Sequence, residues 1–162
     1  MTDRNYTSSF SVAQRPEDVF AAINNVRAWW SAGIEGSADK VGDVFVHHIQ
    51  DMHRCEIQVT ASIPGEKVAW HVLDNYFSFT KDKSEWIGTD IVFDIRRRGD
   101  KTEVKVTHVG LTPEYECYEI CVDGWGTYFN GSLRDLIATG KGQPNVGEAI
   151  TASEEVLLAG RR

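Results

Sequence analysis

The sequence predicts an α+β fold in which a curved antiparallel β-sheet wraps around one long C-terminal helix, with two short helices after the first strand. Three observations predict it. The middle of the chain contains short segments in which apolar and polar residues alternate. The turns between most of these segments are short, which is typical of an antiparallel meander. One long segment near the C-terminus has the periodicity of an amphipathic helix.

The N-terminal part is expected to hold one strand and two helices. The first strand is predicted over residues 5–12. A helix should begin at Pro16, because proline is tolerated at the first helical position and the two acidic residues that follow suit the positive end of the helix dipole. A short second helix should include Trp29 and Trp30, and residues 31–42, with three glycines, should form a loop.

Five further strands are expected, and each has one parity of apolar residues that would face inward. In the segment 53–61, for example, His53 and Cys55 share a parity with the aliphatic residues that follow. The segment 74–88 is a long interruption of this pattern. The five predicted strands are 43–49, 53–61, 67–73, 89–97 and 102–109.

A single amphipathic helix is predicted over residues 114–138, ending before Gly140. Its interior contains three glycines, each of which costs about 1 kcal/mol relative to alanine. Gly124 and Gly131 share a stripe with Cys117 and Cys121, which indicates either close approach to another surface or space left for a ligand.

Composition and charge narrow the function classes. The 162 residues fit one domain, over residues 1–143, and a tail over residues 144–162 that could form a short helix. A net charge of −7 opposes nonspecific binding to nucleic acid or to an anionic membrane surface. The basic run at residues 96–98 is too short for a phosphate-tracking surface, and no apolar run has the length of a membrane helix.

The three cysteines, an odd number, favour a reducing compartment, so we expect a cytoplasmic protein; the polar start of the chain gives no sign of a signal peptide. Cys117 and Cys121 would point the same way from a helix, and with a histidine they could bind zinc. Buried structural thiols are the plainer interpretation, and their placement on one helix is awkward for a disulfide. We expect no metal and no cofactor.

Four segments together resemble the SRPBCC, or START-like, superfamily with its helix-grip fold. The resemblance is to the branch of homologues of the activator of heat-shock-protein ATPase. It covers about residues 5–140. The four segments are PEDVFAAI from Pro16, the Trp29–Trp30 pair, TEVKVTHVGL from Thr102, and the helix that contains Gly124–Trp125, Tyr128–Phe129 and SLRDL from Ser132.

The resemblance implies an internal cavity between the sheet and the long helix, often for an apolar or amphipathic small molecule. Three departures from the branch stand out: one glycine at Gly42 where the branch often has two, the long segment 74–88, and the tail after Gln143. The chain also lacks the additional domain of the eukaryotic co-chaperone, which weakens a role as a direct chaperone activator.

Ten inward positions are the predicted ligand-binding residues, because aromatic and aliphatic walls provide apolar contact area and histidines can orient a polar group. The histidines could act instead as general acid or base, or be ordinary hydrogen-bonded interior residues. The ten are Phe45, His47, His53, Cys55, Ile57, Trp70, Phe93, His108, Trp125 and Phe129.

Three functions stay open at this level. The favoured one is a binding protein for a small apolar or amphipathic molecule. The second is an enzyme of cyclase or hydrolase type that uses His47, His53 or His108, although the sequence has no catalytic signature. The third is a co-chaperone-like interaction or stress-response module. The aromatic segment 76–86 could cover the cavity, dock a partner, or pack on the domain or across a homodimer.

Overall fold

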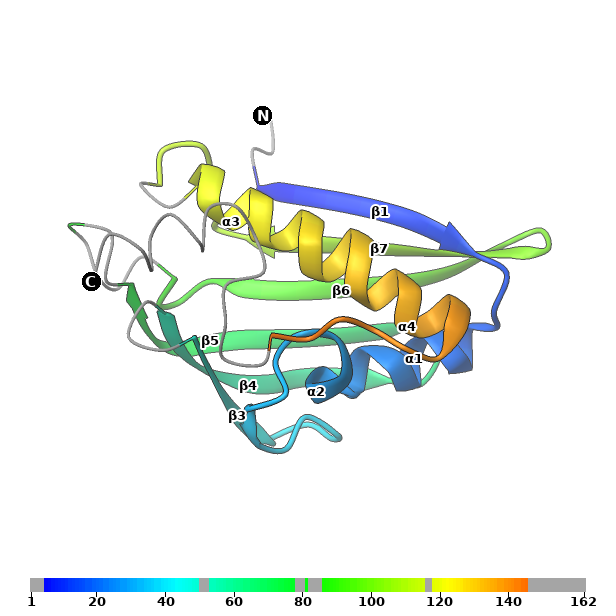
Figure 1. Ribbon diagram of the computed structural model, residues 1–162, viewed down its shortest axis with the longest axis horizontal. Helices are drawn as coiled ribbons and strands as arrows, with labels where there is room; N and C mark the ends of the chain where they lie inside the picture. Colours follow the sequence, from blue (N-terminus) through cyan, green and yellow to red (C-terminus); the bar gives the residue numbers. More distant parts are fainter. Residues whose placement is uncertain (1–4, 50–52, 78–80, 82–85, 116–117, 146–162) are drawn as a thin grey trace.

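The computed structural model describes residues 5–49, 53–77, 81, 86–115 and 118–145. A seven-stranded antiparallel sheet curves around a long helix near the C-terminus (Figure 1), which confirms the predicted α+β helix-grip fold. Its order is β1-β7-β6-β5-β4-β3-β2. The strands are β1 (Tyr6–Val12), β2 (Glu35–Gly36), β3 (Val44–Ile49), β4 (His53–Ile63), β5 (Lys67–Phe77), β6 (Asp90–Arg98) and β7 (Lys101–Val109).

Alternation along the strands separates a buried concave face from a more exposed convex one. In β7, the even-numbered residues from 102 to 108 are all buried, and the residues between them are partly or fully exposed. The same pattern holds in β6 and in the first half of β4. Inward side chains of neighbouring strands therefore form continuous rows across the sheet.

Two strand predictions need correction. The strand expected to end at residue 73 continues to Phe77, because its second half pairs with the start of β4, where His53 lies opposite Phe77. The expected loop 31–42 contains the short strand β2, which pairs with β3. Pairing with a neighbouring strand supplied the order that the local sequence did not predict.

A β-bulge at Leu73 explains why the alternation of apolar and polar residues in the sequence breaks off there. Ile57 pairs with Val72 and Glu56 pairs with Asp74, so Leu73 is an extra residue on β5. The extra residue shifts the parity of everything that follows it. As a result, Val72 and Asn75 both face inward although they are three residues apart.

The long helix has three parts: α3 (Tyr118–Trp125), a π-helical segment η1 (Gly126–Leu133) and α4 (Arg134–Thr139). The prediction of one regular helix from residue 114 was wrong in two respects. Residues 112–115 form a turn, and the middle of the helix is widened, so that the Arg134 N–H reaches the carbonyl oxygen of Phe129. The two glycines of η1, which are poor α-helix formers, lie in this widened part.

Gly124 and Gly131, the glycines of the small-residue stripe, make no close contact with other described residues. A side chain added at Gly124 would meet no atom within 4 Å, and at Gly131 only a carbonyl oxygen at 3.8 Å. The close-approach interpretation is therefore wrong for these two glycines. Close approach occurs instead at Gly142, where an added Cβ would lie 2.5 Å from the Ala28 carbonyl oxygen.

The two predicted short helices are α1 (Pro16–Asn24) and α2 (Val26–Trp29). A strap over residues 140–145, drawn in orange in Figure 1, returns from α4 toward α2. At its end the Asn145 N–H donates to the Trp30 carbonyl oxygen (2.8 Å), and the Ala32 N–H donates to the Asn145 carbonyl oxygen (2.9 Å). The remainder of the predicted tail lies outside the described residues.

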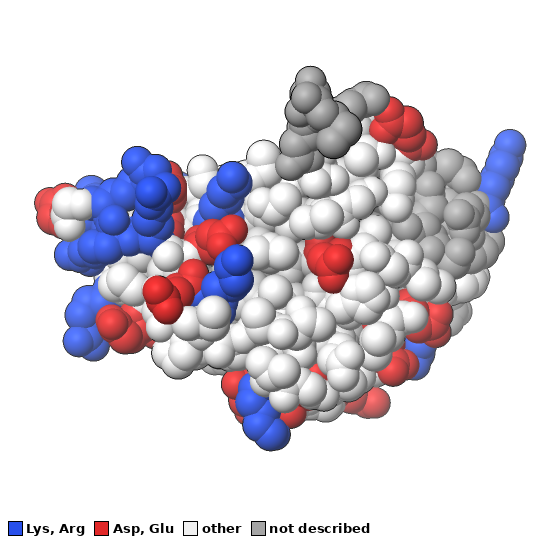
Figure 2. All heavy atoms as spheres, turned by 180° about the vertical axis from the view of Figure 1, so that it is seen from behind, with Lys and Arg blue, Asp and Glu red and all other residues white. Residues whose placement is uncertain are grey.

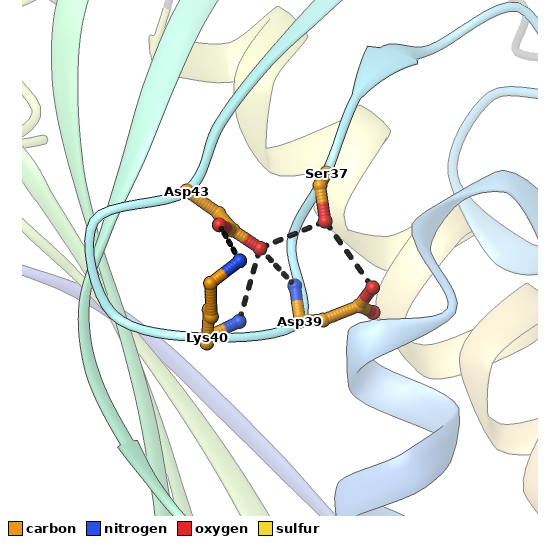
Figure 3. Close-up of polar contacts among 4 residues, drawn as sticks. All are labelled: Ser37, Asp39, Lys40 and Asp43. Atoms are coloured by element: carbon orange, nitrogen blue, oxygen red, sulfur yellow. Dashed lines mark hydrogen bonds and ion pairs between the residues drawn. The ribbon is translucent and has the colours of Figure 1, made fainter.

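The loop between β2 and β3 is organised around one carboxylate (Figure 3). Asp43 Oδ2 accepts hydrogen bonds from Ser37 Oγ (2.7 Å) and from the backbone N–H groups of Asp39 (3.1 Å) and Lys40 (3.2 Å). Its other oxygen lies 2.9 Å from Lys40 Nζ. The Lys40 and Ser37 hydrogen bonds lower the pKa of Asp43 to about 2.

Charge is unevenly distributed over the surface. Figure 2 shows Lys and Arg gathered at one end of the convex face, where the β6–β7 hairpin carries the exposed residues Arg96, Arg97, Arg98 and Lys101. The rest of that face is mostly uncharged. Among the described helices, none is long and apolar enough to cross a membrane.

Candidate functional site

Three neighbouring strands bring polar side chains together on the concave face. His47 on β3 lies opposite Cys55 on β4, and Cys55 lies opposite Asn75 on β5. The three side chains are buried and form one row across the sheet. His53, at the neighbouring inward position of β4, joins them, and its ring centroid lies 5.3 Å from that of His47.

Asn75 links this row to His53. His53 Nε2 lies 2.9 Å from Asn75 Oδ1, so this nitrogen carries the proton and donates to the amide oxygen. The His53 ring also packs against the Trp86 ring in a T-shaped arrangement, with the ring centroids 5.0 Å apart. Burial lowers the pKa of His53 to about 4, and the hydrogen bond to Asn75 offsets only part of this effect.

His108 is engaged at both ring nitrogens. Trp125 Nε1–H donates to His108 Nδ1 (3.3 Å), which fixes the neutral tautomer with its proton on Nε2. His108 Nε2–H then donates to Thr89 Oγ1 (2.9 Å), whose hydroxyl donates to the Trp86 carbonyl oxygen (2.7 Å). Burial, with His53 nearby, lowers the pKa of His108 to about 3. His108 therefore joins β7 to the long helix and has no ring nitrogen left for proton transfer.

His47 is in the opposite situation. It has no exposed surface, and neither ring nitrogen has a hydrogen-bond partner. Its ring is stacked on Trp30, with ring centroids 4.3 Å apart. Burial, and then the nearby His53 and His48, hold the pKa of His47 well below its ordinary value. The ring is thus neutral at pH 7, with one N–H to donate and one lone pair to accept.

Aromatic rings fill the interior beside this row. Trp30 stacks on Trp70 at 5.9 Å as well as on His47, and Phe93 packs edge-on against Trp70 at 4.9 Å. Trp70 has no exposed surface, and its Nε1–H has no hydrogen-bond partner. The Asn75 amide nitrogen is likewise buried without a partner.

All ten predicted site residues are buried on the concave face or on the helix that covers it. The structure brings His47, His53 and Cys55 together on β3 and β4, whereas His108 and Trp125 lie in a separate hydrogen-bonded group. Phe129 packs against Phe10 instead, at 4.8 Å. Their contact with a ligand stays a prediction.

The sequence singled out neither Asn75 nor Thr89. Asn75 falls after the bulge at Leu73, where alternation counted from the preceding residues gives the wrong face. Thr89 stands at the start of a strand, and only the fold places it against His108. Trp86 belongs to the segment expected to cover the cavity, dock a partner, or pack on the domain or across a homodimer. It is buried and packs on His53 and His108, in agreement with packing on the domain. Phe79 and the Phe77 side chain lie outside the described residues.

Two of the three cysteines lie within the described residues. Cys55 and Cys121 are buried, and burial raises the pKa of the Cys55 thiol. Cys117 lies outside the described residues. Within the described ranges, no three His, Cys, Asp or Glu side chains come together as a metal site.

No protein-family model and no curated protein matches this sequence. Solved structures do match its fold. The Aha1 dimer from Colwellia psychrerythraea is 24% identical, with a TM-score of 0.68 over 85% of this chain and 98% of that one. MLL2253 from Mesorhizobium loti is 14% identical, with a TM-score of 0.64 over 78% and 92% of the two chains.

A third match is CalU16 from Micromonospora echinospora, which is 11% identical, with a TM-score of 0.59 over 83% of this chain and 76% of that one. Identities this low establish a common architecture and not a common activity. The sheet order, the two short helices and the long C-terminal helix agree with the resemblance seen in the sequence. The chain therefore has the helix-grip fold, which it shares with Aha1 from Colwellia psychrerythraea.

Proposed function

We propose that the protein binds a small apolar or amphipathic molecule in the interior between the sheet and the long helix. The observation that carries this proposal is the group of buried, unpartnered polar atoms on His47, Trp70 and Asn75 amid aromatic rings. Binding sites for small molecules combine apolar walls with a few polar groups that fix orientation. A buried polar atom without a partner costs about 1–3 kcal/mol, and a ligand can supply the partner.

The aromatic surroundings support the apolar part of this proposal. Trp30, Trp70 and Phe93 offer large, rigid ring surfaces of the kind that hold aromatic or aliphatic ligands. Because these side chains are packed together, entry of a ligand has to displace some of them. Binding is then expected to be slower than diffusion allows.

Native mass spectrometry of the freshly purified protein is the direct test, followed by denaturing extraction of any bound compound. A discrete extra mass that disappears on denaturation supports the proposal and identifies the ligand class. The same instrument then tests 1-methylnaphthalene, 1-naphthamide and 1-naphthoate as added probes. An unliganded mass and no saturable binding of any probe would overturn the proposal.

A pair of variants places the binding site. Trp30→Leu removes the ring that joins His47 to Trp70, so we expect at least about tenfold weaker binding of the bound compound or probe. Tyr76→Leu removes an exposed aromatic residue of β5, 43% exposed, and should leave affinity unchanged. Equal effects of the two variants would move the site away from the concave interior.

The remaining partner and location inferences are also proposals. Aha1 from Colwellia psychrerythraea is described as a dimer, and its similarity supports a homodimer here; light scattering after size-exclusion chromatography measures this. The odd number of cysteines in the sequence, three, supports the reducing cytoplasm as the location.

A further inference from the structure

The buried polar atoms without a partner on His47, Trp70 and Asn75 are mostly hydrogen-bond donors. Trp70 Nε1 and Asn75 Nδ2 can only donate hydrogen bonds, and neutral His47 offers one donor and one acceptor. Donors therefore outnumber acceptors among them. We call His47, Asn75 and Trp70, together with Trp30 and His53, the His47 cluster.

The contacts within the His47 cluster keep these donors in one region. Trp30 stacks on both His47 and Trp70, with 4.3 and 5.9 Å between the ring centroids. Asn75 is fixed by the hydrogen bond from His53, whose ring centroid lies 5.3 Å from that of His47. The group that satisfies the cluster must accept several hydrogen bonds at once.

We propose that the His47 cluster recognises a carboxylic acid group, and that the ligand is an apolar, aromatic or aliphatic, molecule with this acid at one end. A carboxyl group has two oxygens that together accept several hydrogen bonds. The two nitrogens of one imidazole point in different directions, so one carboxyl group cannot bind both. The Asn75 amide nitrogen therefore supplies the second donor. This inference rests on the proposed binding function and adds the ligand's chemical class.

The protonation states of the free ligand and of His47 predict that binding takes up a proton. In water at pH 7 the free ligand is a carboxylate, while burial keeps the pKa of His47 low and its ring neutral. A buried carboxylate facing a neutral ring would be an uncompensated charge, which is costly. The complex must therefore hold one more proton, on His47 or on the acid, and binding takes this proton from the solvent.

Other titratable groups around His47 do not change this balance. His53 and Cys55 face it from β4, and His48 neighbours it on β3; Trp30, next to α2, contributes no titratable group. Between pH 6 and 8, His53 remains neutral because its pKa is lowered to about 4, and Cys55 remains a thiol because burial raises its pKa. The expected uptake is about one proton per bound acid.

The test compares 1-naphthoate, 1-naphthamide and 1-methylnaphthalene by calorimetry in buffers of different ionisation enthalpy. Naphthoate should bind at least about tenfold more tightly than methylnaphthalene at pH 6, take up about one proton, and lose about tenfold in affinity per pH unit up to pH 8. Naphthamide, which cannot ionise, should bind without proton uptake. Attachment of naphthoate to the basic β6–β7 hairpin would show no proton uptake.

His47→Phe keeps a ring in the stack and removes both nitrogens, so the preference for naphthoate should fall to less than about threefold. His48→Phe is the matched control, because His48 is exposed on the same strand and should leave the preference intact.

Equal binding of acid and hydrocarbon, binding without proton uptake, or a preference that survives His47→Phe would overturn this inference while leaving the proposed function standing. Failure of all three probes would count against both. The proton-uptake measurement uses the wild-type protein, so it decides the question even where His47→Phe does not fold.

Discussion

At the scale of single residues, two histidines on one concave face have opposite chemistry. His108 has both ring nitrogens in hydrogen bonds, whereas His47 has neither. Both lie on inward strand positions, and that much follows from alternation in the sequence. Whether each ring has a hydrogen-bond partner depends on residues that are distant in the chain, such as Trp125 and Thr89 for His108.

The difference between these histidines predicts the outcome of replacing each by phenylalanine. His47→Phe removes two unpartnered polar atoms, so the free energy of unfolding should stay constant or rise by about 1 kcal/mol. His108→Phe leaves Trp125 Nε1 without its acceptor and removes the donor to Thr89 Oγ1, so it should lower the free energy of unfolding by at least about 2 kcal/mol. Urea unfolding at pH 7 measures both. A larger loss for His47→Phe would show that its nitrogens are bonded in solution.

Asp43 permits a second prediction at this scale. Its pKa is lowered by the Lys40 and Ser37 hydrogen bonds, so its contribution to stability is present above the unfolded-state value of about 4 and is lost as pH falls through about 2. Asp43→Asn should therefore lower the thermal midpoint by a constant amount from pH 6 to 8. Lys40→Met, which leaves the three hydrogen bonds to Oδ2, should lower it less. A deficit that changes across this pH range would contradict the assignment.

At the scale of elements, a buried hydrogen bond from Trp125 connects the long helix to the sheet at β7. Trp125 on α3 donates to His108 on β7, while the equally large Trp70 on β5 donates to nothing. The variants Trp125→Phe and Trp70→Phe remove the same atoms, but only the first leaves a buried acceptor unpaired. We expect Trp125→Phe to cost about 1–2 kcal/mol more in free energy of unfolding than Trp70→Phe. Equal costs in chemical denaturation would show that the Trp125 hydrogen bond adds nothing to docking of the helix.

At the scale of the whole molecule, three buried neutral histidines should make the protein sensitive to acid. Their pKa values are lowered by burial, so the unfolded state takes up protons first as pH falls below about 6.5. Stability is full above that pH. Below that pH, each histidine lowers the free energy of unfolding by about 1.4 kcal/mol per pH unit, which makes about 4 kcal/mol per pH unit for the three. The loss continues down to the folded-state pKa, which is about 4 for His53 and about 3 for His108.

Guanidinium unfolding at pH 7, 6 and 5 measures this slope. His47→Phe should reduce it by about one proton, and His48→Gln, at an exposed position, should leave it unchanged. A slope that is the same in the wild type and in His47→Phe would mean that His47 titrates normally in the folded protein.

Local sequence patterns predict the α+β architecture, the two short helices and the burial of the ten predicted site residues. Each of these depends on local periodicity and on end signals such as Pro16 and Gly140, which act within a few residues. Periodicity also carries errors forward: one extra residue at Leu73 reversed the parity after it and concealed Asn75.

Which buried polar groups have hydrogen-bond partners depends on contacts between residues that are distant in the sequence. His47, Trp70 and Asn75 come from two strands, and Trp30 from the end of a helix, so no local pattern relates them. The same holds for the His108 group, in which β7, α3 and the start of β6 meet. Hydrogen bonding between distant side chains depends on distance and direction in space, and alternation along a strand fixes only the face on which a side chain lies.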